Sequence, residues 1–333
     1  MFKRGIKMIN LNIFTDNYTY QRNDNHATKE LEKKLASMYG AKKVFLTNSG
    51  MEAITTLFDY LLPKGGTVVI NKDTYHETKQ WLKQSKRFYV KEIDFNEFSI
   101  FNSLEHDKKI KSIIQDATVF YLDDPSVFGK WHDLTDIVNY LKIFNYDSKV
   151  IVDNTMFSFY YSDPIKSKVD YVVESYSKYV SGHGDVMAGA IICTHKPPED
   201  MKKFIGNKGI CVNDLTVFLL NRSLQTLAVR MEKHTENAKY IHKKLEEKNI
   251  EHFYAGFGGV IIFPGLDEEF CDKLAKLGHF KKCPTFGTTF STTSFVRSSN
   301  SYSIKIFARI SCGLEDKKVL WKDLKTALSL SKT

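Results

Sequence analysis

Short apolar runs and longer amphipathic stretches alternate along this chain. The amphipathic stretches have the 3.6-residue spacing of helices and cover residues 28–39, 50–61, 135–144 and 322–330. The apolar runs are bounded by turn-type residues and are typical of strands, at residues 67–71, 118–122, 149–153, 188–194 and 304–311. Because strands and helices alternate through most of the chain, the pattern predicts an α/β fold with a mostly parallel sheet covered by helices.

One helical pattern is much longer than the others. It runs from about Asn213 to Glu247 without Gly or Pro, so it predicts a continuous helix that leads into a smaller C-terminal domain. We therefore expect a large domain at 41–235 and a small α+β domain at 236–333. Thr28 is the residue expected to cap the first helix.

Length and composition indicate a globular protein. The 333 residues are 42% hydrophobic, which is enough for a large buried core. No run of 18 apolar residues occurs, so we expect no membrane span. The N-terminus is basic and then briefly apolar, without the long apolar core and small-residue cleavage site of a signal peptide, so we expect a cytoplasmic protein.

The charges and cysteines exclude some classes of site. The net charge is +9, but lysines are scattered and alternate with acids, as on solvated helix faces. This favours anionic ligands such as phosphates and argues against a nucleic-acid partner. The five cysteines are far apart, odd in number and without a CxxC pair, which argues against a disulfide framework or a zinc site.

Candidate chemistry begins with an aspartate and a lysine. Asp153 ends an apolar strand, where α/β sheets place ligand groups. Lys178 follows 25 residues later, beside the hydroxyls of Ser175 and Ser177 and before a glycine-rich stretch. Alone, Asp153 is as readily a strand-end turn or cap, and an isolated lysine is more often on the surface.

Together these segments resemble the Cys/Met-metabolism family, which includes cystathionine synthases and lyases and methionine γ-lyase. The resemblance implies an α/β fold of type I and a pyridoxal 5'-phosphate (PLP) cofactor. In this family the aspartate contacts the pyridine nitrogen and the lysine holds the cofactor as a Schiff base. Asp153 and Lys178 are the residues that match these roles.

Other parts of the chain extend the resemblance. It implies cofactor-phosphate binding by Ser49, Gly50 and Met51, which open a predicted helix, with hydroxyl donors from Ser175 and Ser177. Tyr75 matches the tyrosine that stacks on the cofactor ring, and Arg309 matches the arginine that grips the substrate α-carboxylate. Tyr20 and Arg22 match residues that reach the cofactor phosphate of a neighbouring subunit, so residues 1–40 are expected to contact that neighbour.

Some positions depart from the family pattern. Fewer residues separate Lys178 from Arg309 than the family leads us to expect, so the C-terminal domain is expected to be trimmed. Gln80 lies near the position where relatives that act on cystathionine carry an arginine. Thr285 begins a segment in which Phe290 replaces a frequent glutamate, so we expect a pocket for uncharged side chains.

The resemblance implies a PLP-dependent lyase or transferase that eliminates or replaces a group at Cβ or Cγ of an amino acid. It also implies a homo-oligomer, a dimer or tetramer with shared active sites. Two alternatives stay open: another PLP reaction on the same fold, such as transamination or racemisation, and a degenerate homologue that acts as a binding protein. The sequence does not name the substrate.

Overall fold

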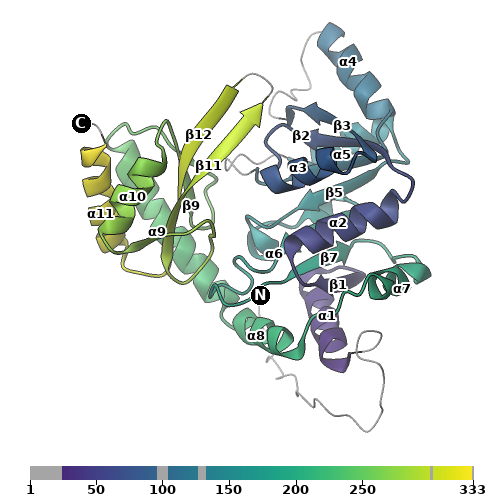
Figure 1. Ribbon diagram of the computed structural model, residues 1–333, viewed down its shortest axis with the longest axis horizontal. Helices are drawn as coiled ribbons and strands as arrows, with labels where there is room; N and C mark the ends of the chain where they lie inside the picture. Colours follow the sequence, from purple (N-terminus) through teal and green to yellow (C-terminus); the bar gives the residue numbers. More distant parts are fainter. Residues whose placement is uncertain (1–24, 96–103, 127–132, 301–302, 332–333) are drawn as a thin grey trace.

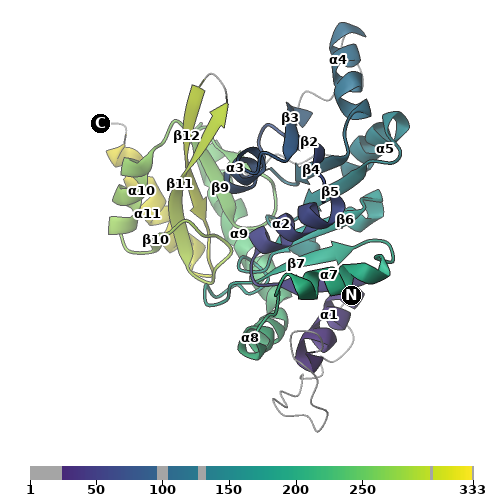
Figure 2. The ribbon, with the colours of Figure 1, turned by 45° about the vertical axis from the view of Figure 1, so that its right-hand side comes forward.

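The computed structural model describes residues 25–95, 104–126, 133–300 and 303–331. These residues form two sheets with helices packed on them, and Figures 1 and 2 show the sheets beside one another. The helices are α1 (His26–Tyr39), α2 (Gly50–Leu61), α3 (His76–Gln84), α4 (Leu104–Gln115), α5 (Leu134–Phe144), α6 (Ser158–Tyr161), α7 (Glu199–Asn207), α8 (Asp214–Leu224), α9 (Leu227–Glu246), α10 (Glu268–Lys276) and α11 (Lys317–Leu330).

The larger sheet has the order β1-β7-β6-β5-β4-β2-β3 within the described residues. Its strands are β1 (Lys43–Thr47), β2 (Gly66–Asn71), β3 (Phe88–Ile93), β4 (Val119–Asp123), β5 (Lys149–Asp153), β6 (Tyr171–Ser175) and β7 (Gly189–Cys193). β7 runs antiparallel to both neighbours, and the other pairs are parallel. The mostly parallel sheet predicted from the sequence is therefore confirmed.

Apolar side chains alternate along the strands and feed a core on each face of this sheet. On β5, Val150 and Val152 pack with α1, α5 and α8, whereas Ile151 packs with α2, α3 and α7. Side chains of alternate residues point to opposite faces of a strand, so this division follows from the pattern of the sequence. With both faces covered, the polar residues that are not needed for packing gather at the strand ends.

The smaller sheet has the order β10-β11-β12-β9-β8. Its strands are β8 (Phe253–Tyr254), β9 (Val260–Pro264), β10 (Phe280–Lys282), β11 (Ser291–Asn300) and β12 (Ser303–Ser311). α9 contributes to both parts of the molecule: Met231 belongs to the core of the larger sheet, and Ala238 and Leu245 belong to that of the smaller one. We propose that the boundary between the two domains lies inside α9.

Two local predictions were wrong. The pattern from Asn213 to Glu247 forms two helices, because the buried Arg230 donates to the Ser223 carbonyl at 3.0 Å and to the Thr226 hydroxyl at 3.1 Å, stabilising a break between α8 and α9. The cap of α1 is Asn25, whose side chain accepts from the backbone amide of Thr28. Thr28 instead lies inside the first turn.

The first described helix, α1, belongs to the segment expected to contact a neighbouring subunit, and it packs on this chain's own core. Leu31 and Leu35 of α1 are buried against the larger sheet.

None of the helices in the described ranges is long and apolar enough to cross a membrane. All five cysteines are free thiols; Cys193, Cys271 and Cys312 are buried, but Cys211 is exposed.

Candidate active site

Polar side chains gather where β4, β5 and β6 end. Asp123 on β4 is the register partner of Asp153 on β5, and β6 ends at Ser175, three residues before Lys178. The carboxyl ends of parallel strands share one edge of a sheet, and open α/β sheets bind ligands outside that edge. The candidate active site therefore lies here.

Asp153 is held by hydrogen-bond donors from two elements. Its Oδ2 accepts from the Tyr121 hydroxyl at 2.9 Å, and its Oδ1 accepts from the Thr155 hydroxyl at 2.5 Å and the Thr155 amide at 3.0 Å. Burial raises the pKa of Asp153, while these donors oppose that rise. Asp153 is half-buried, and among the described residues it forms no ion pair, so its carboxylate can accept a cationic partner.

Asp123 is a second carboxyl group beside the first. Its oxygens accept from the backbone amide of Tyr75 at 3.3 and 3.4 Å. Burial, and then the charge of Asp153, raise the pKa of Asp123 well above its usual range. Two adjacent buried carboxyl groups do not both ionise readily. Asp153 has the closer donors, so we assign the charge to Asp153 and the proton to Asp123.

Lys178 lies in the loop after β6, with its amine facing the smaller sheet. Its Nζ donates to the Thr285 hydroxyl at 3.2 Å and lies 5.1 Å from the centroid of the Phe286 ring. Burial, and then the charge of Arg309, lower the pKa of Lys178 to about 8. More of this amine is therefore unprotonated near neutral pH than of an ordinary lysine, which favours a nucleophilic role.

Arg309 reaches the same place from β12. Its guanidinium donates to the Pro284 carbonyl at 2.9 Å and lies 5.3 Å from the Phe286 ring centroid, so Phe286 lies close to both cations. Within the part of the chain that the structure describes, neither Lys178 nor Arg309 forms an ion pair. Two neighbouring cations without a carboxylate make a site for an anionic group.

The start of α2 provides a second place for an anion. Ser49 caps this helix by accepting from the Glu52 amide at 3.0 Å. The amides of Gly50 and Met51 lie in the first turn, where a helix has no acceptors of its own for them. A Cβ at Gly50 would lie 2.7 Å from the Cβ of Ser175, so glycine is what allows Ser175 to approach the helix start. Unused amides at a helix N-terminus attract phosphate.

Tyr75 stands at the rim of this site. It is the residue that precedes α3, and its side chain is 37% exposed. Burial, and then the charge of Glu77, raise the pKa of Tyr75, whereas the charge of Arg309 opposes the rise. Its ring is therefore accessible, and its hydroxyl is within electrostatic reach of Arg309.

The remaining sequence-predicted residues are placed differently. The Ser177 hydroxyl bonds to the backbone of Ala188, accepting from its amide at 3.1 Å, so it braces the loop. Gln80 is exposed on α3. Phe290 packs against Lys281, whose Nζ lies 4.1 Å from the ring centroid. Tyr20 and Arg22 lie outside the described residues.

Sequence reasoning missed four residues of this site: Tyr121, Asp123, Thr155 and Phe286. Asp123 carried the same signal that drew attention to Asp153, an acidic residue at the end of an apolar run. Tyr121 and Phe286 carried no such signal, because an aromatic residue in a strand or loop is usually a packing residue. Only the three-dimensional structure brings them to the polar groups.

Comparison with known proteins places these features in a family. A family model described as "Cys/Met metabolism PLP-dependent enzyme" matches residues 6–276. L-methionine gamma-lyase of Fusobacterium nucleatum subsp. polymorphum is 32% identical over 279 residues, covering 82% of this chain and 66% of that protein. Cystathionine beta-lyase of Neurospora crassa is 31% identical over 245 residues, covering 72% of this chain and 51% of that protein. The chain thus spans two thirds or less of the length of these relatives.

A solved structure resembles the whole described fold. The crystal structure of cystathionine gamma synthase from Xanthomonas oryzae pv. oryzae in complex with cystathionine matches with a TM-score of 0.82. The match covers 98% of this chain and 91% of that chain at 21% sequence identity. At this level of identity the likeness establishes the fold.

Proposed function

This chain belongs to the Cys/Met metabolism family of PLP-dependent enzymes, and on that premise we propose that it catalyses elimination or replacement at Cβ or Cγ of an amino-acid substrate. One observation carries the proposal. The amine of Lys178, with its pKa lowered to about 8, lies with Arg309 at the sheet edge where Asp153 has no counter-ion among the described residues. A nucleophile, a carboxylate-binding cation and an unpaired acid are the groups that this chemistry requires.

The residues present fit the cofactor of the family, pyridoxal 5'-phosphate. The open amides of Gly50 and Met51, beside the Ser175 hydroxyl, suit the phosphate. Asp153 suits a protonated ring nitrogen, because its carboxylate lacks a cation among the described residues. We propose that Tyr75 stacks on the ring and that Lys178 holds the cofactor covalently. When bound, the cofactor supplies an electron sink that lets bonds at Cα, and then at Cβ or Cγ, break.

The chain's own residues then have defined tasks. Arg309 binds the substrate α-carboxylate and fixes the orientation of the Cα–H bond. Lys178 Nζ, once released from the cofactor, takes the proton from Cα, and its pKa near 8 makes it an efficient base close to neutral pH. The Phe286 ring, close to both cations, shields them from water and strengthens their interactions.

We infer a preference for uncharged substrate side chains, such as an O-acetylated homoserine or a thioether. Phe290 and Phe286 offer apolar surface, and a buried charged group without a partner costs several kcal/mol. Lys281 beside Phe290 further disfavours a cationic distal group. We propose that Gln80 and Thr285 also contact the substrate.

We also propose a cytoplasmic homo-oligomer, a dimer or tetramer, whose subunits share active sites. No cation among the described residues bonds to Ser49, Gly50, Met51 or Ser175, yet a phosphate carries nearly two negative charges. Arg22 and Tyr20, from the segment that crosses between subunits in the family, would complete the site. Mixing Lys178→Ala and Arg22→Ala chains should restore some activity, because one hybrid site is then intact.

Free thiols in all five cysteines agree with a reducing compartment.

Product analysis over a panel of amino acids tests the proposed reaction. Purified enzyme with added PLP is incubated with O-acetylhomoserine, methionine, cysteine and cystathionine, and products are identified by mass spectrometry. We expect a keto acid and ammonia together with a released thiol or acid, or a thioether amino acid when a thiol is supplied. Products of transamination or racemisation alone would contradict the proposal.

Arg309→Ala should lower kcat/KM for every substrate by a factor equivalent to about 2 to 5 kcal/mol.

A further inference from the structure

We propose that Tyr121 on β4 is a positioning residue that fixes the Asp153 carboxylate for its contact with the cofactor ring nitrogen. This inference rests on the proposed function, because it assigns Asp153 to the cofactor. It adds a residue from a neighbouring strand to the chemistry. It also gives a task to a hydroxyl that packing alone does not explain.

The ring of Tyr121 is a core residue, but its hydroxyl is not needed for packing. The side chain is fully buried, and its ring centroid lies 5.8 Å from that of Phe58. Phenylalanine would fill the same space without bringing a polar atom into an apolar core. A buried hydroxyl requires hydrogen-bond partners, and this one donates to Asp153 Oδ2 at 2.9 Å.

Each oxygen of Asp153 has its own donor element. Thr155 holds Oδ1 from the turn that follows β5, and its hydroxyl also accepts from the Ser175 amide at 2.9 Å. Tyr121 holds Oδ2 from the adjacent strand. The carboxylate is thus fixed from both sides. Without the Tyr121 hydroxyl, Oδ2 loses that donor, so the charged form of Asp153 becomes less favourable and the proton assigned to Asp123 can move to Asp153.

Tyr121 also lies near the proposed phosphate site. Thr78 on α3 is close enough to influence the Tyr121 hydroxyl, and the Thr78 hydroxyl lies 3.8 Å from the sulfur of Met51 in the first turn of α2. The groups proposed to bind the two ends of the cofactor are therefore neighbours. Its hydroxyl stays protonated, because burial, and then the charges of Asp153 and Asp123, raise the pKa of Tyr121 well above its usual range.

The test compares two tyrosines in the same apolar core. Tyr121→Phe removes the hydroxyl beside Asp153, and Tyr171→Phe removes one at the start of β6, at the opposite edge of the sheet. We expect Tyr121→Phe to raise the dissociation constant of PLP about tenfold or more, as for a hydrogen bond to a charged group. The ¹⁵N chemical shift of the ring nitrogen in labelled PLP should also move toward its unprotonated value. Tyr171→Phe should change neither quantity.

Combination with Asp153→Asn separates this inference from the proposed function. In that background Tyr121→Phe should have no further effect on PLP affinity. In protein without PLP, the four members of this double-mutant cycle are unfolded in urea, and we expect the two substitutions to be coupled in the free energy of unfolding. If wild type binds no PLP, the proposed function fails, and the unfolding cycle still tests the contact. The inference would be overturned if Tyr121→Phe and Tyr171→Phe changed PLP affinity equally. It would also be overturned if the Tyr121 and Asp153 substitutions were additive in both PLP affinity and the free energy of unfolding.

Discussion

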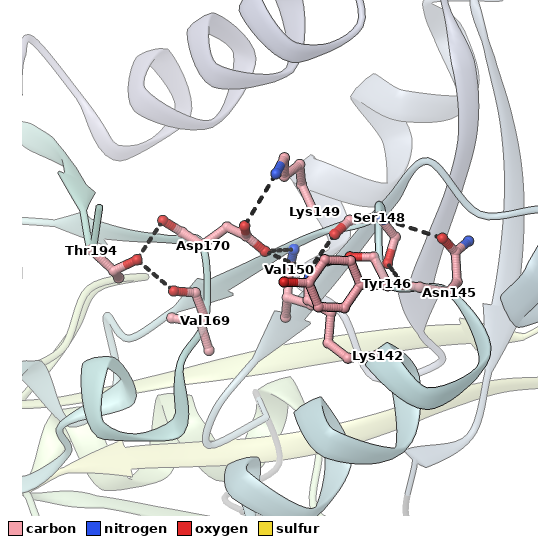
Figure 3. A network of polar contacts seen from close by, with 9 residues as sticks. All are labelled: Lys142, Asn145, Tyr146, Ser148, Lys149, Val150, Val169, Asp170 and Thr194. Atoms are coloured by element: carbon pink, nitrogen blue, oxygen red, sulfur yellow. Dashed lines mark hydrogen bonds and ion pairs between the residues drawn. The ribbon is translucent and has the colours of Figure 1, made fainter. Parts of the chain in front are cut away.

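At the amino ends of β5 and β6 a half-buried aspartate is paired with cations, whereas at their carboxyl ends a half-buried aspartate meets neutral donors only. Figure 3 shows the first arrangement, centred on Asp170. Its carboxylate accepts from Lys142 at 3.1 Å, from Lys149 at 3.4 Å and from the amide of Val150 at 2.9 Å. Thr194 and Asn145 bond to neighbouring backbone groups, so the polar groups of this end are matched within the chain.

The carboxyl end leaves its charges unmatched. Among the described residues, Asp153, Asp123 and Glu174 form no ion pair, and burial raises the pKa of each. The cations Lys178 and Arg309 instead lie close to each other, and burial lowers the pKa of both. Such an arrangement costs folding free energy, because buried charges without partners are destabilising. We infer that the amino ends of these strands serve stability, whereas the carboxyl ends are kept ready for a ligand.

The largest expected effect separates two lysines. Lys178→Ala should lower turnover by at least about 1000-fold, because the proposed base and anchor is lost. Lys142→Ala should leave turnover near the wild-type value and lower the free energy of unfolding by about 1 to 3 kcal/mol, since it breaks the Asp170 pair. Steady-state kinetics and urea unfolding measure the two quantities. Equal loss of turnover in both variants would contradict the assignment of catalysis to Lys178 and of stability to Lys142.

Two aspartates sharpen the same contrast. Asp170→Asn should lower the free energy of unfolding by about 2 to 4 kcal/mol, because Lys142 and Lys149 lose their shared partner, and PLP affinity should not change. Asp153→Asn should keep or slightly increase the stability of the protein without PLP, because it removes a charge that desolvation disfavours and that forms no ion pair among the described residues, and should weaken PLP binding. Urea unfolding and PLP titration report these effects. A strongly destabilised Asp153→Asn protein would argue that Asp153 is a structural residue.

Glu174 predicts a pH dependence of stability. Burial raises the pKa of this side chain to about 8, from an ordinary value of 4.5. Between pH 4.5 and 8 the unfolded chain releases this proton and the folded chain keeps it, so stability falls as pH rises through this window, by a few kcal/mol in all. In Glu174→Gln that part of the slope should disappear. Urea unfolding from pH 5 to 9 checks this, and identical slopes in both proteins would contradict it.

The smallest expected effect concerns the rate of cofactor capture. Protein without PLP should capture the cofactor faster as pH rises and reach a plateau above about pH 8, because the Lys178 amine reacts only when unprotonated. The rise in the visible absorbance band measures this rate. A rate that still climbs toward pH 10 would mean that Lys178 behaves like an ordinary exposed lysine.

Much of the fold was predictable from local pattern. The α/β class, fold type I and the position of β5 follow from alternating periodicity and from the family segments, and the structure and the comparisons confirm them. The break between α8 and α9 was not predictable, because it depends on Arg230 reaching across to loop carbonyls rather than on Gly or Pro. A side-chain contact between distant residues leaves no periodic signal.

Site residues were predictable where they belong to one continuous sequence motif. They were not predictable where they meet only through the pairing register of neighbouring strands. Asp153 and Lys178 stand in one recognisable stretch. Asp123 and Tyr121 become partners of Asp153 only through the pairing of β4 with β5, which periodicity does not specify. Phe286, four residues from the predicted Phe290, is the ring close to both cations, because the loop geometry decides which aromatic faces the site.

Covalent labelling tests the central claim most directly. Purified protein is incubated with PLP, reduced with borohydride, digested and mapped by mass spectrometry, with Lys178→Arg as the matched control. We expect a single phosphopyridoxyl group on Lys178 in the wild type and none in the variant. A label on another lysine, or a wild-type protein that takes up no PLP, would contradict it.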